Sequence, residues 1–235
     1  MAKPRFDLLA RADTSIGELV LRRRRVQADP GTTFVELLVD ERVLMSDYNS
    51  VSERALAHEG VARCPGKQLR VLVGGLGLGH TAHEALSSER VAAVEVIEFV
   101  PQIVDWFERS LIPLARELRT DPRFGVTLDD VYARLSRPAT EHFDLILVDV
   151  DHAPDDPLAA ASAPFYTADG LRRASEHLTP DGILAVWSCA ESPEFEATVR
   201  EVFATLETER TLFQDDMFDE PDEINCLFFA SEPRG

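Results

Sequence analysis

The stretch "RVLVGGLGLGHTAHEAL", from Arg70 to Leu86, indicates the fold of most of this 235-residue chain. A run of apolar residues typical of a buried strand ends in a glycine-rich turn, and an alanine-rich helical pattern follows. Glycine permits positive φ angles and carries no Cβ, so this turn lets the backbone approach a ligand closely. A strand, a glycine turn and a helix in this order form the first unit of a Rossmann-like sheet.

Strand-like and helical segments alternate from Leu69 to the C-terminal part of the chain. Five apolar strand-like runs are separated by helical patterns, which include one long helix over residues 100–119. The last two β-like runs, 207–213 and 224–230, have no helix between them and can pair antiparallel. The sequence therefore predicts an α/β protein with a Rossmann-like class I methyltransferase fold, whose mostly parallel seven-stranded sheet is covered on both faces.

The first part of the chain has a different pattern. Short extended runs between residues 16 and 46 are broken by "ADPG" and "DER", which predicts a small antiparallel β-meander. A helix follows, with Ser50 or Ser52 as its cap. We expect an N-terminal β-meander domain over residues 1–60 and a Rossmann-like catalytic domain over residues 61–235.

Composition and charge limit the kinds of partner that the chain can bind. The formal net charge of -18 opposes binding to nucleic acid and suits a cationic ligand, although it also serves solubility. The basic run from Arg22 to Arg25 lies in a strand-like stretch without interleaved aromatic residues, so it does not predict a nucleic-acid site. No apolar run approaches the roughly 20 residues of a membrane span, and the N-terminal residues lack a signal-peptide pattern. We expect a cytoplasmic protein with no membrane partner.

The glycine turn and two later carboxylates predict a nucleoside site. The glycines at 75, 77 and 79 form G-x-G-x-G, whereas the dinucleotide motif would place glycine where His80 stands. The turn therefore fits adenosyl-sulfonium enzymes better than NAD enzymes, with a plain tight turn as the alternative. Glu98 ends the second strand and can accept the ribose hydroxyls, with Glu95 as its competitor. Asp130 ends the third strand, where a carboxylate can take the adenine amino group.

The loop after the fourth strand, within "LILVDVDHAPDD", is rich in acidic residues, and we expect it to face the reacting centre. Asp149 emerges directly from a buried strand and can hold an amine and accept its proton, while Asp151 adds negative charge. Neighbouring carboxylates raise one another's pKa, which favours a base. His152 is an alternative base, and a merely solvated acidic loop is the other reading. The pattern His80, His83, Glu84 is not H-E-x-x-H, so no protein-bound metal is expected.

Taken together, these motifs resemble those of the spermidine synthase family, the polyamine aminopropyltransferases, over nearly the whole chain. The family motif G-G-G-D-G is similar to "GLGLG" at 75–79, and V-E-I-D-P is similar to "IEFVP" at 97–101. The stretches "DPRFGVTLDD" and "FDLILVDVDHAP" are similar to two further family motifs. The resemblance implies a β-meander before a Rossmann-like domain, supports Glu98 and Asp130 as nucleoside ligands, and makes a homodimer usual, although no dimer signature is visible here.

The departures from the family pattern fall on the amine half of the site. The family aspartate that holds the aminopropyl ammonium of decarboxylated S-adenosylmethionine corresponds to Leu78, and the second loop aspartate corresponds to His152. The tyrosine and glutamine of Y-Q-E correspond to Ser52 and Glu53, and a meander glutamine corresponds to Leu44. The resemblance is therefore to a divergent, spermidine-synthase-like branch.

From these residues and the resemblance we expect a transferase that uses S-adenosylmethionine (AdoMet) or decarboxylated AdoMet. Its acceptor would be a small cationic amine, and its product S-adenosylhomocysteine or methylthioadenosine. Two alternatives are true polyamine aminopropyl transfer and nucleoside binding without turnover. The expected catalytic residues are Asp149, Asp151 and His152, and the expected cofactor-binding residues are Gly75, Gly77, Leu78, Gly79, Glu98 and Asp130.

Overall fold

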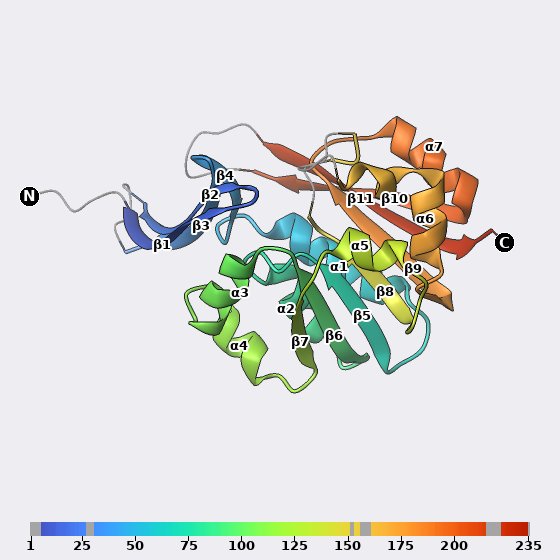
Figure 1. Ribbon diagram of the computed structural model, residues 1–235, viewed down its shortest axis with the longest axis horizontal. Coiled ribbons are helices and arrows are strands. Elements are labelled where there is room, and N and C mark those ends of the chain that lie inside the picture. Colours follow the sequence, from blue (N-terminus) through green and yellow to red (C-terminus); the bar gives the residue numbers. More distant parts are fainter. Residues whose placement is uncertain (1–5, 27–30, 151–152, 156–160, 215–221, 235) are drawn as a thin grey trace, which may run out of the picture.

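A computed structural model of the chain describes residues 6–26, 31–150, 153–155, 161–214 and 222–234 (Figure 1). The N-terminal part forms an antiparallel sheet in the spatial order β1-β2-β3-β4. Its strands are β1 (Phe6–Thr14), β2 (Gly17–Arg25), β3 (Thr33–Val39) and β4 (Arg42–Ser46). The predicted meander is therefore present, and it includes one strand more than the sequence pattern indicated.

That additional strand is β1. Its residues alternate only weakly between exposed and half-buried positions, and its register with β2 shifts between Leu8 and Ala10. A strand with so little buried surface has no clear period-2 signal in the sequence. The arginines of β2 do not simply face solvent, because Arg22 and Arg24 both form ion pairs with Glu36 on β3, at 2.5 and 3.1 Å.

The second and larger sheet follows in the chain. Its elements, with the helices between them, are α1 (Val51–Arg63), β5 (Leu69–Gly74), α2 (His80–Leu86), β6 (Val91–Glu98), α3 (Pro101–Glu108), α4 (Ala115–Thr120), β7 (Phe124–Leu128), α5 (Val131–Ser136), β8 (Phe143–Val148), the short 3₁₀ helix η1 (Ala163–Tyr166), α6 (Ala168–Ser175), β9 (Leu178–Ser188), α7 (Pro193–Val202), β10 (Phe203–Phe213) and β11 (Glu223–Pro233).

The strand order β7-β6-β5-β8-β9-β11-β10 confirms the predicted class. The first five of these strands pair in parallel, whereas β11 pairs antiparallel with both β9 and β10. This is a mostly parallel seven-stranded sheet that ends in an antiparallel hairpin. Helices on both faces bury it, which explains why its central strands are continuous apolar runs.

Side chains alternate between two cores, one on each face of the large sheet. On β5, Val71 and Val73 join the core that α1, α2, α3 and α4 cover, whereas Leu72 joins the core that α5, α6 and α7 cover. Figure 1 shows these two helical layers on either side of the strands. The carboxyl ends of β5, β6, β7 and β8 are thereby held at one edge, where a Rossmann-like sheet places its ligands.

The long helix predicted over residues 100–119 is two helices, α3 and α4. Helix α3 ends in a Schellman-type turn, in which the Leu111 N–H donates to the Trp106 carbonyl at 2.9 Å. Ser110 supplies the left-handed residue of that turn, with φ 57°. Glycine usually takes this position, so a serine there gave no sequence signal for the break.

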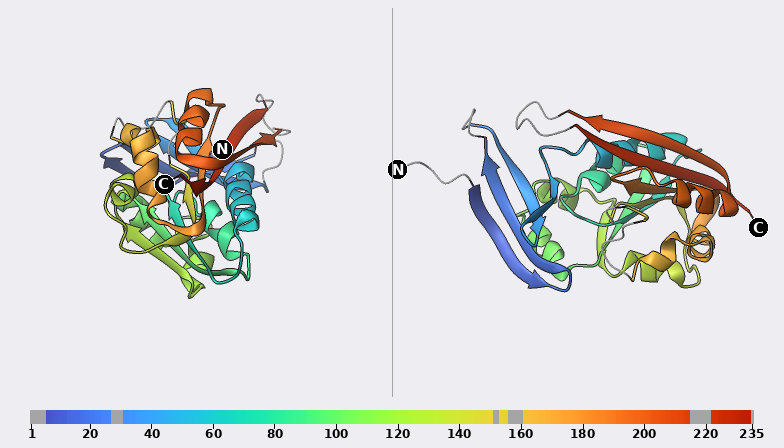
Figure 2. Two further views of the ribbon diagram at one scale, coloured as in Figure 1. Left: turned by 90° about the vertical axis from the view of Figure 1, so that its right-hand side faces the viewer. Right: turned by 90° about the horizontal axis from the view of Figure 1, so that it is seen from above.

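The meander packs across the edge that carries the glycine turn. Leu19, Leu21 and Leu37 are buried in the same core as Leu76 and Leu78 of the turn. The right-hand view of Figure 2 shows the meander standing across one end of the molecule. The expected division of the chain at residue 60 falls within α1, which packs on the large sheet, and stays a prediction.

Candidate functional site

The glycine turn between β5 and α2 has the backbone that only glycine adopts without strain. The φ angles of Gly75, Gly77 and Gly79 are 93°, 48° and 89°. A Cβ at Gly75 would lie 2.5 Å from the backbone oxygen of Asp149, and one at Gly77 would lie 2.6 Å from the sulfur of Met45. The absence of a Cβ at Gly75 and Gly77 therefore lets Asp149 and Met45 pack directly against the turn. A larger residue at either position would push these neighbours, and the cavity described below, out of place.

Glu98 at the end of β6 holds the glycine turn in place. Its carboxylate accepts hydrogen bonds from the Leu76 N–H at 2.9 Å and the Val100 N–H at 2.7 Å. Burial raises the pKa of Glu98, and the backbone N–H groups oppose that rise. Glu95 lies elsewhere, 3.7 Å from the Arg134 guanidinium. Of the two candidates, the structure places Glu98 at the turn, and its binding of ribose stays a prediction.

Asp130 caps helix α5. Its Oδ1 accepts hydrogen bonds from the Tyr132 N–H at 2.9 Å and the Ala133 N–H at 3.2 Å. Its surroundings form a separate groove of about 380 Å³ between α5, η1 and α6. The structure thus gives Asp130 a local role in starting a helix, and its contact with adenine stays a prediction.

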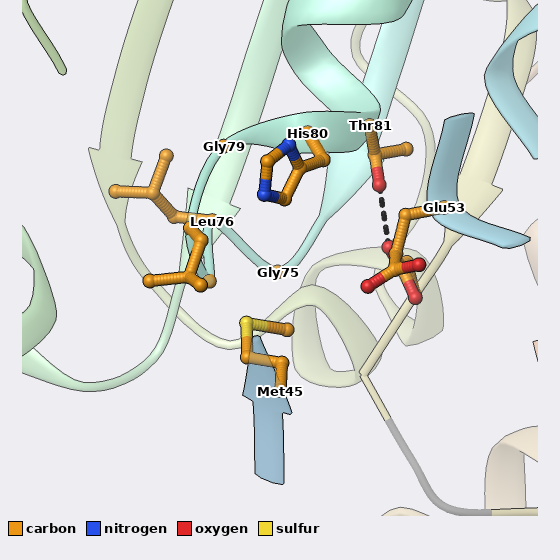
Figure 3. Close-up of a pocket in the computed structure, with 10 residues that line it drawn as sticks. Met45, Glu53, Gly75, Leu76, Gly79, His80 and Thr81 are labelled. Atoms are coloured by element: carbon orange, nitrogen blue, oxygen red, sulfur yellow. Dashed lines mark hydrogen bonds between the residues drawn. The ribbon is translucent and has the colours of Figure 1, made fainter. Parts of the chain in front are cut away.

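A small cavity of about 10 Å³ lies where the meander meets the glycine turn. It is lined by Met45, Glu53, Gly75, Leu76, Gly77, Leu78, Gly79, His80, Thr81 and Asp149 (Figure 3). The cavity brings together five of the expected residues: the donor-side residues Gly75, Gly77, Leu78 and Gly79, and the expected base Asp149. Asp151 and His152 lie outside the described residues.

Leu78 is the apolar residue that the turn carries toward the cavity. Its side chain is 1% exposed and belongs to the core beneath the meander. No carboxylate stands at this position, so the turn offers no charged partner to a cation here. Leu78, which stands where the family has an aspartate, therefore makes this part of the cavity wall apolar instead of negatively charged.

Asp149 faces a second carboxylate that the sequence did not predict as part of the site. Asp149 follows β8 and accepts a hydrogen bond from the Thr81 hydroxyl of α2, drawn as the dashed line in Figure 3. Glu53 lies in the first turn of α1 and accepts a hydrogen bond from the Ser52 hydroxyl at 2.9 Å. Both carboxylates line the cavity.

Burial makes this pair basic. It raises the pKa of Glu53 to about 7, with the negative charge of Asp149 as the second cause. Burial also raises the pKa of Asp149 to about 6, against the lowering effect of the Thr81 hydroxyl. Two carboxyl groups that titrate near neutral pH can exchange protons with a substrate, and active sites concentrate such groups.

The raised pKa values predict a pH-dependent stability. Between about pH 4 and pH 7 the folded protein binds more protons at Glu53 and Asp149 than the unfolded chain does. The free energy of unfolding should therefore fall as the pH rises through this window, by at most about 1.4 kcal/mol per pH unit for each proton of difference. Urea unfolding at several pH values measures this slope.

The control for that slope is Glu53→Gln, which removes one of the two groups and keeps the shape. The variant should show a shallower fall than the native chain, since the other acids of the protein contribute equally to both. Identical slopes in the two proteins would show that Glu53 has an ordinary pKa.

The described part of the chain contains no cluster of three or more His, Cys, Asp or Glu side chains with the geometry to hold a metal ion. Within the same residues, every helix is too short or too polar to cross a membrane. His83 belongs to the His80, His83, Glu84 pattern that did not match a metal motif, and its Nε2 lies 3.0 Å from the Glu117 carboxylate.

No protein-family model matches the chain. The chain is 32% identical over 140 residues to a polyamine aminopropyltransferase of Prochlorococcus marinus, which covers 57% of this chain and 44% of that protein. It is 27% identical over 155 residues to the enzyme of the same name from Clostridium acetobutylicum, covering 66% of this chain and 51% of that protein. The chain thus matches about half the length of these relatives.

A relative from a second class of transferase also matches. The chain is 33% identical over 115 residues to an eEF1A lysine and N-terminal methyltransferase homolog of Drosophila pseudoobscura, covering 47% of this chain and 16% of that protein. Among solved structures, spermidine synthase from Thermotoga maritima superposes with a TM-score of 0.73 at 18% identity. A spermidine synthase in complex with the transition state analogue AdoDATO superposes with a TM-score of 0.74 at the same identity. These two structures cover 96% of this chain, and the chain covers 72% and 73% of them.

The solved structures identify the fold. The fold is the spermidine synthase fold, with a seven-stranded Rossmann-like sheet behind an N-terminal antiparallel sheet. The curated relatives agree with the resemblance that the motifs indicated, since the chain is similar to polyamine aminopropyltransferases over about half of their length.

Proposed function

We propose that this protein is a transferase that uses AdoMet, or its decarboxylated form, to alkylate a small cationic amine. The observation that carries the proposal is the carboxylate pair, Glu53 and Asp149, which faces the glycine turn across one small cavity. The names of the relatives support it, because aminopropylation of a polyamine and methylation of lysine or an N-terminus all alkylate an amine nitrogen.

The residues present have the chemistry to hold an adenosyl donor, and Met45 must move to open the cavity of about 10 Å³ to it. The three left-handed glycines form a wall without Cβ atoms, and the flexible side chain of Met45 fills the space before Gly77. Under the proposal, Gly75, Gly77 and Gly79 form the wall against the donor, Glu98 takes the ribose and Asp130 the adenine. When bound, the donor supplies an electrophilic carbon on a sulfonium sulfur.

Asp149 would act on the acceptor. Its pKa of about 6 leaves it ionised at neutral pH, so it holds an ammonium group and accepts the proton that the amine must lose before it attacks. The Thr81 hydroxyl fixes one of its oxygens and thereby orients the other. Glu53 lies on the same side of the cavity as Asp149, and with its pKa raised to about 7 it is partly ionised at neutral pH and adds negative charge, which favours a cationic acceptor over a neutral one.

The negative net charge of -18 agrees with a cationic substrate and disfavours nucleic acid as a partner. The proposal includes a cytoplasmic location, no membrane partner and a homodimer, of which the last follows from the resemblance alone. Aminopropyl transfer and methyl transfer differ in their product. Mass spectrometry after incubation with each donor and a set of polyamines and lysine peptides would detect methylthioadenosine in the first case and S-adenosylhomocysteine in the second.

Donor choice rests on Leu78. An aspartate at this position would attract the free ammonium of decarboxylated AdoMet and repel the carboxylate of AdoMet. The leucine does neither, so we expect AdoMet to bind at least as tightly as decarboxylated AdoMet. Leu78→Asp should shift the preference toward the decarboxylated form by roughly 1–2 kcal/mol, for a partly screened charge pair.

Calorimetry gives the ratio of the two dissociation constants in the native chain and the variant, with Leu78→Asn as the uncharged control. A native protein that prefers decarboxylated AdoMet about tenfold or more would show that another acid anchors the ammonium. The aminopropyltransferase alternative would then replace methyl transfer. The second alternative, nucleoside binding without turnover, predicts binding of either donor and formation of neither product.

A further inference from the structure

His80 is a buried polar side chain without a partner. It is the first residue of α2 and only 6% of it is exposed. Neither ring nitrogen has a hydrogen-bond partner among the residues that the structure describes. Buried polar groups in folded proteins are nearly always hydrogen-bonded, so an imidazole with both nitrogens unsatisfied calls for an explanation.

The buried His177 and the half-buried His83 differ from His80 in this respect. The Nε2 of His177 lies 3.0 Å from the Arg137 carbonyl oxygen, and that of His83 lies 3.0 Å from a Glu117 carboxylate oxygen. His80 is also the one of the three that lines the cavity at the glycine turn. Its missing partner is therefore best sought in what the cavity binds.

The surroundings of His80 keep its imidazole neutral, so that it can donate one hydrogen bond. Burial, together with the positive charges of Arg54 and His83, lowers the pKa of His80 to about 4. The ring is therefore neutral at physiological pH, with one N–H donor and one acceptor nitrogen. Its N–H can donate to an anion, and the nearby Arg54 is itself paired with Glu84 at 3.7 Å.

The acidic side of the cavity lies apart from this imidazole. Figure 3 shows the ring of His80 beside Gly79, and the carboxylate of Glu53 beyond Thr81. Thr81 in turn donates to Asp149. The cavity thus offers an uncharged N–H donor, His80, on one side and two carboxylates, Glu53 and Asp149, on the other. Under the proposed function the two carboxylates serve the cationic acceptor, so the unpartnered N–H of His80 is left for an anionic group of the donor.

We propose that His80 donates a hydrogen bond to the α-carboxylate of AdoMet and thereby makes the intact amino acid end of the donor a recognition element. The inference rests on the proposed function and deepens it, because it names which form of the donor the cavity takes. Decarboxylated AdoMet and methylthioadenosine both lack this carboxylate, so they make no use of His80. Leu78 removes the carboxylate that holds the donor ammonium in the family, and His80 adds a partner for the donor carboxylate. Together they would change the preferred donor from decarboxylated AdoMet to AdoMet.

The test is calorimetry with AdoMet, decarboxylated AdoMet and methylthioadenosine on the native chain, His80→Leu and His80→Gln. His80→Leu should weaken AdoMet binding about tenfold to a hundredfold, the effect of losing a hydrogen bond to a charged group. It should change the affinity for the other two compounds by less than about twofold. His80→Gln keeps an N–H donor and should recover most of the AdoMet affinity.

Three outcomes would overturn the inference. Unchanged AdoMet affinity in His80→Leu would show that the ring does not contact the carboxylate. An equal loss for all three compounds would make His80 a structural residue of the turn. If the native chain bound none of the three, the proposed function itself would fail, which is distinguishable from failure at His80 alone.

A measurement on the native chain covers the case in which a variant does not fold. The imidazole ¹⁵N signals of His80, assigned by their loss in His80→Gln or by proximity to Thr81 in the native protein, should shift on addition of AdoMet. Methylthioadenosine at saturation should leave them nearly unchanged. Equal shifts with both ligands would contradict a contact to the carboxylate.

Discussion

Asp149→Asn is expected to lower turnover by about 100-fold or more while it leaves the affinity for adenosyl compounds nearly unchanged. The amide keeps the shape of the side chain, and its oxygen can still accept the hydrogen bond of the Thr81 hydroxyl. It removes the negative charge and the basicity that a raised pKa of about 6 gives Asp149. Initial rates with AdoMet and the acceptor found by product analysis measure the loss.

The matched control is Asp105→Asn, the same chemical change at an exposed carboxylate of α3 that pairs with Arg109. It should leave the rate unchanged. A parallel loss of binding and turnover in Asp149→Asn would mark Asp149 as a donor ligand or a structural residue. Turnover near that of the native chain would move the role of base to Glu53, or to Asp151 or His152 beyond the described residues.

Glu98→Ala is expected to have the second large effect, on both binding and stability. Removal of the carboxylate leaves the buried N–H groups of Leu76 and Val100 without their acceptor, at a cost of about 1–3 kcal/mol for each unsatisfied group. The glycine turn then loses its fixed position. Loss of two charge-assisted hydrogen bonds to ribose should weaken adenosyl binding by about 1–3 kcal/mol.

Chemical unfolding and calorimetry separate these two effects. Glu95→Gln is the control, because Glu95 lies on the same strand but contacts Arg134 rather than the turn. It should change neither quantity by much. Adenosyl affinity that stays unchanged in a folded Glu98→Ala protein would contradict the ribose assignment and leave Glu98 as a purely structural residue.

The fold was predictable from the sequence because its central strands are buried on both faces. Runs such as Leu69–Gly74 and Phe143–Val148 have no polar alternation, which is the signature of a covered parallel sheet. Strand β1 and the break at Ser110 were not predictable in the same way. The strand buries little surface, and the helix ends in a left-handed serine rather than a glycine.

The candidate site was only partly predictable, for a physical reason. Residues at strand ends, such as Glu98 and Asp149, can be located from the strand pattern alone. Glu53 and Met45 come from the start of α1 and from the meander, and only the packing of those elements on the glycine turn brings them to the cavity. His80 stands directly after the third glycine, but burial without a partner is a property of the packed structure.

The most direct test of this account is whether the native protein binds AdoMet, measured by isothermal titration calorimetry with methylthioadenosine as a competitor. We predict saturable binding at one site per chain, weakened by Glu98→Ala and displaced by methylthioadenosine, since the two share the nucleoside. No detectable binding of either compound at about 1 mM, which corresponds to a binding free energy weaker than about −4 kcal/mol, would contradict the proposal that the glycine turn is a nucleoside site.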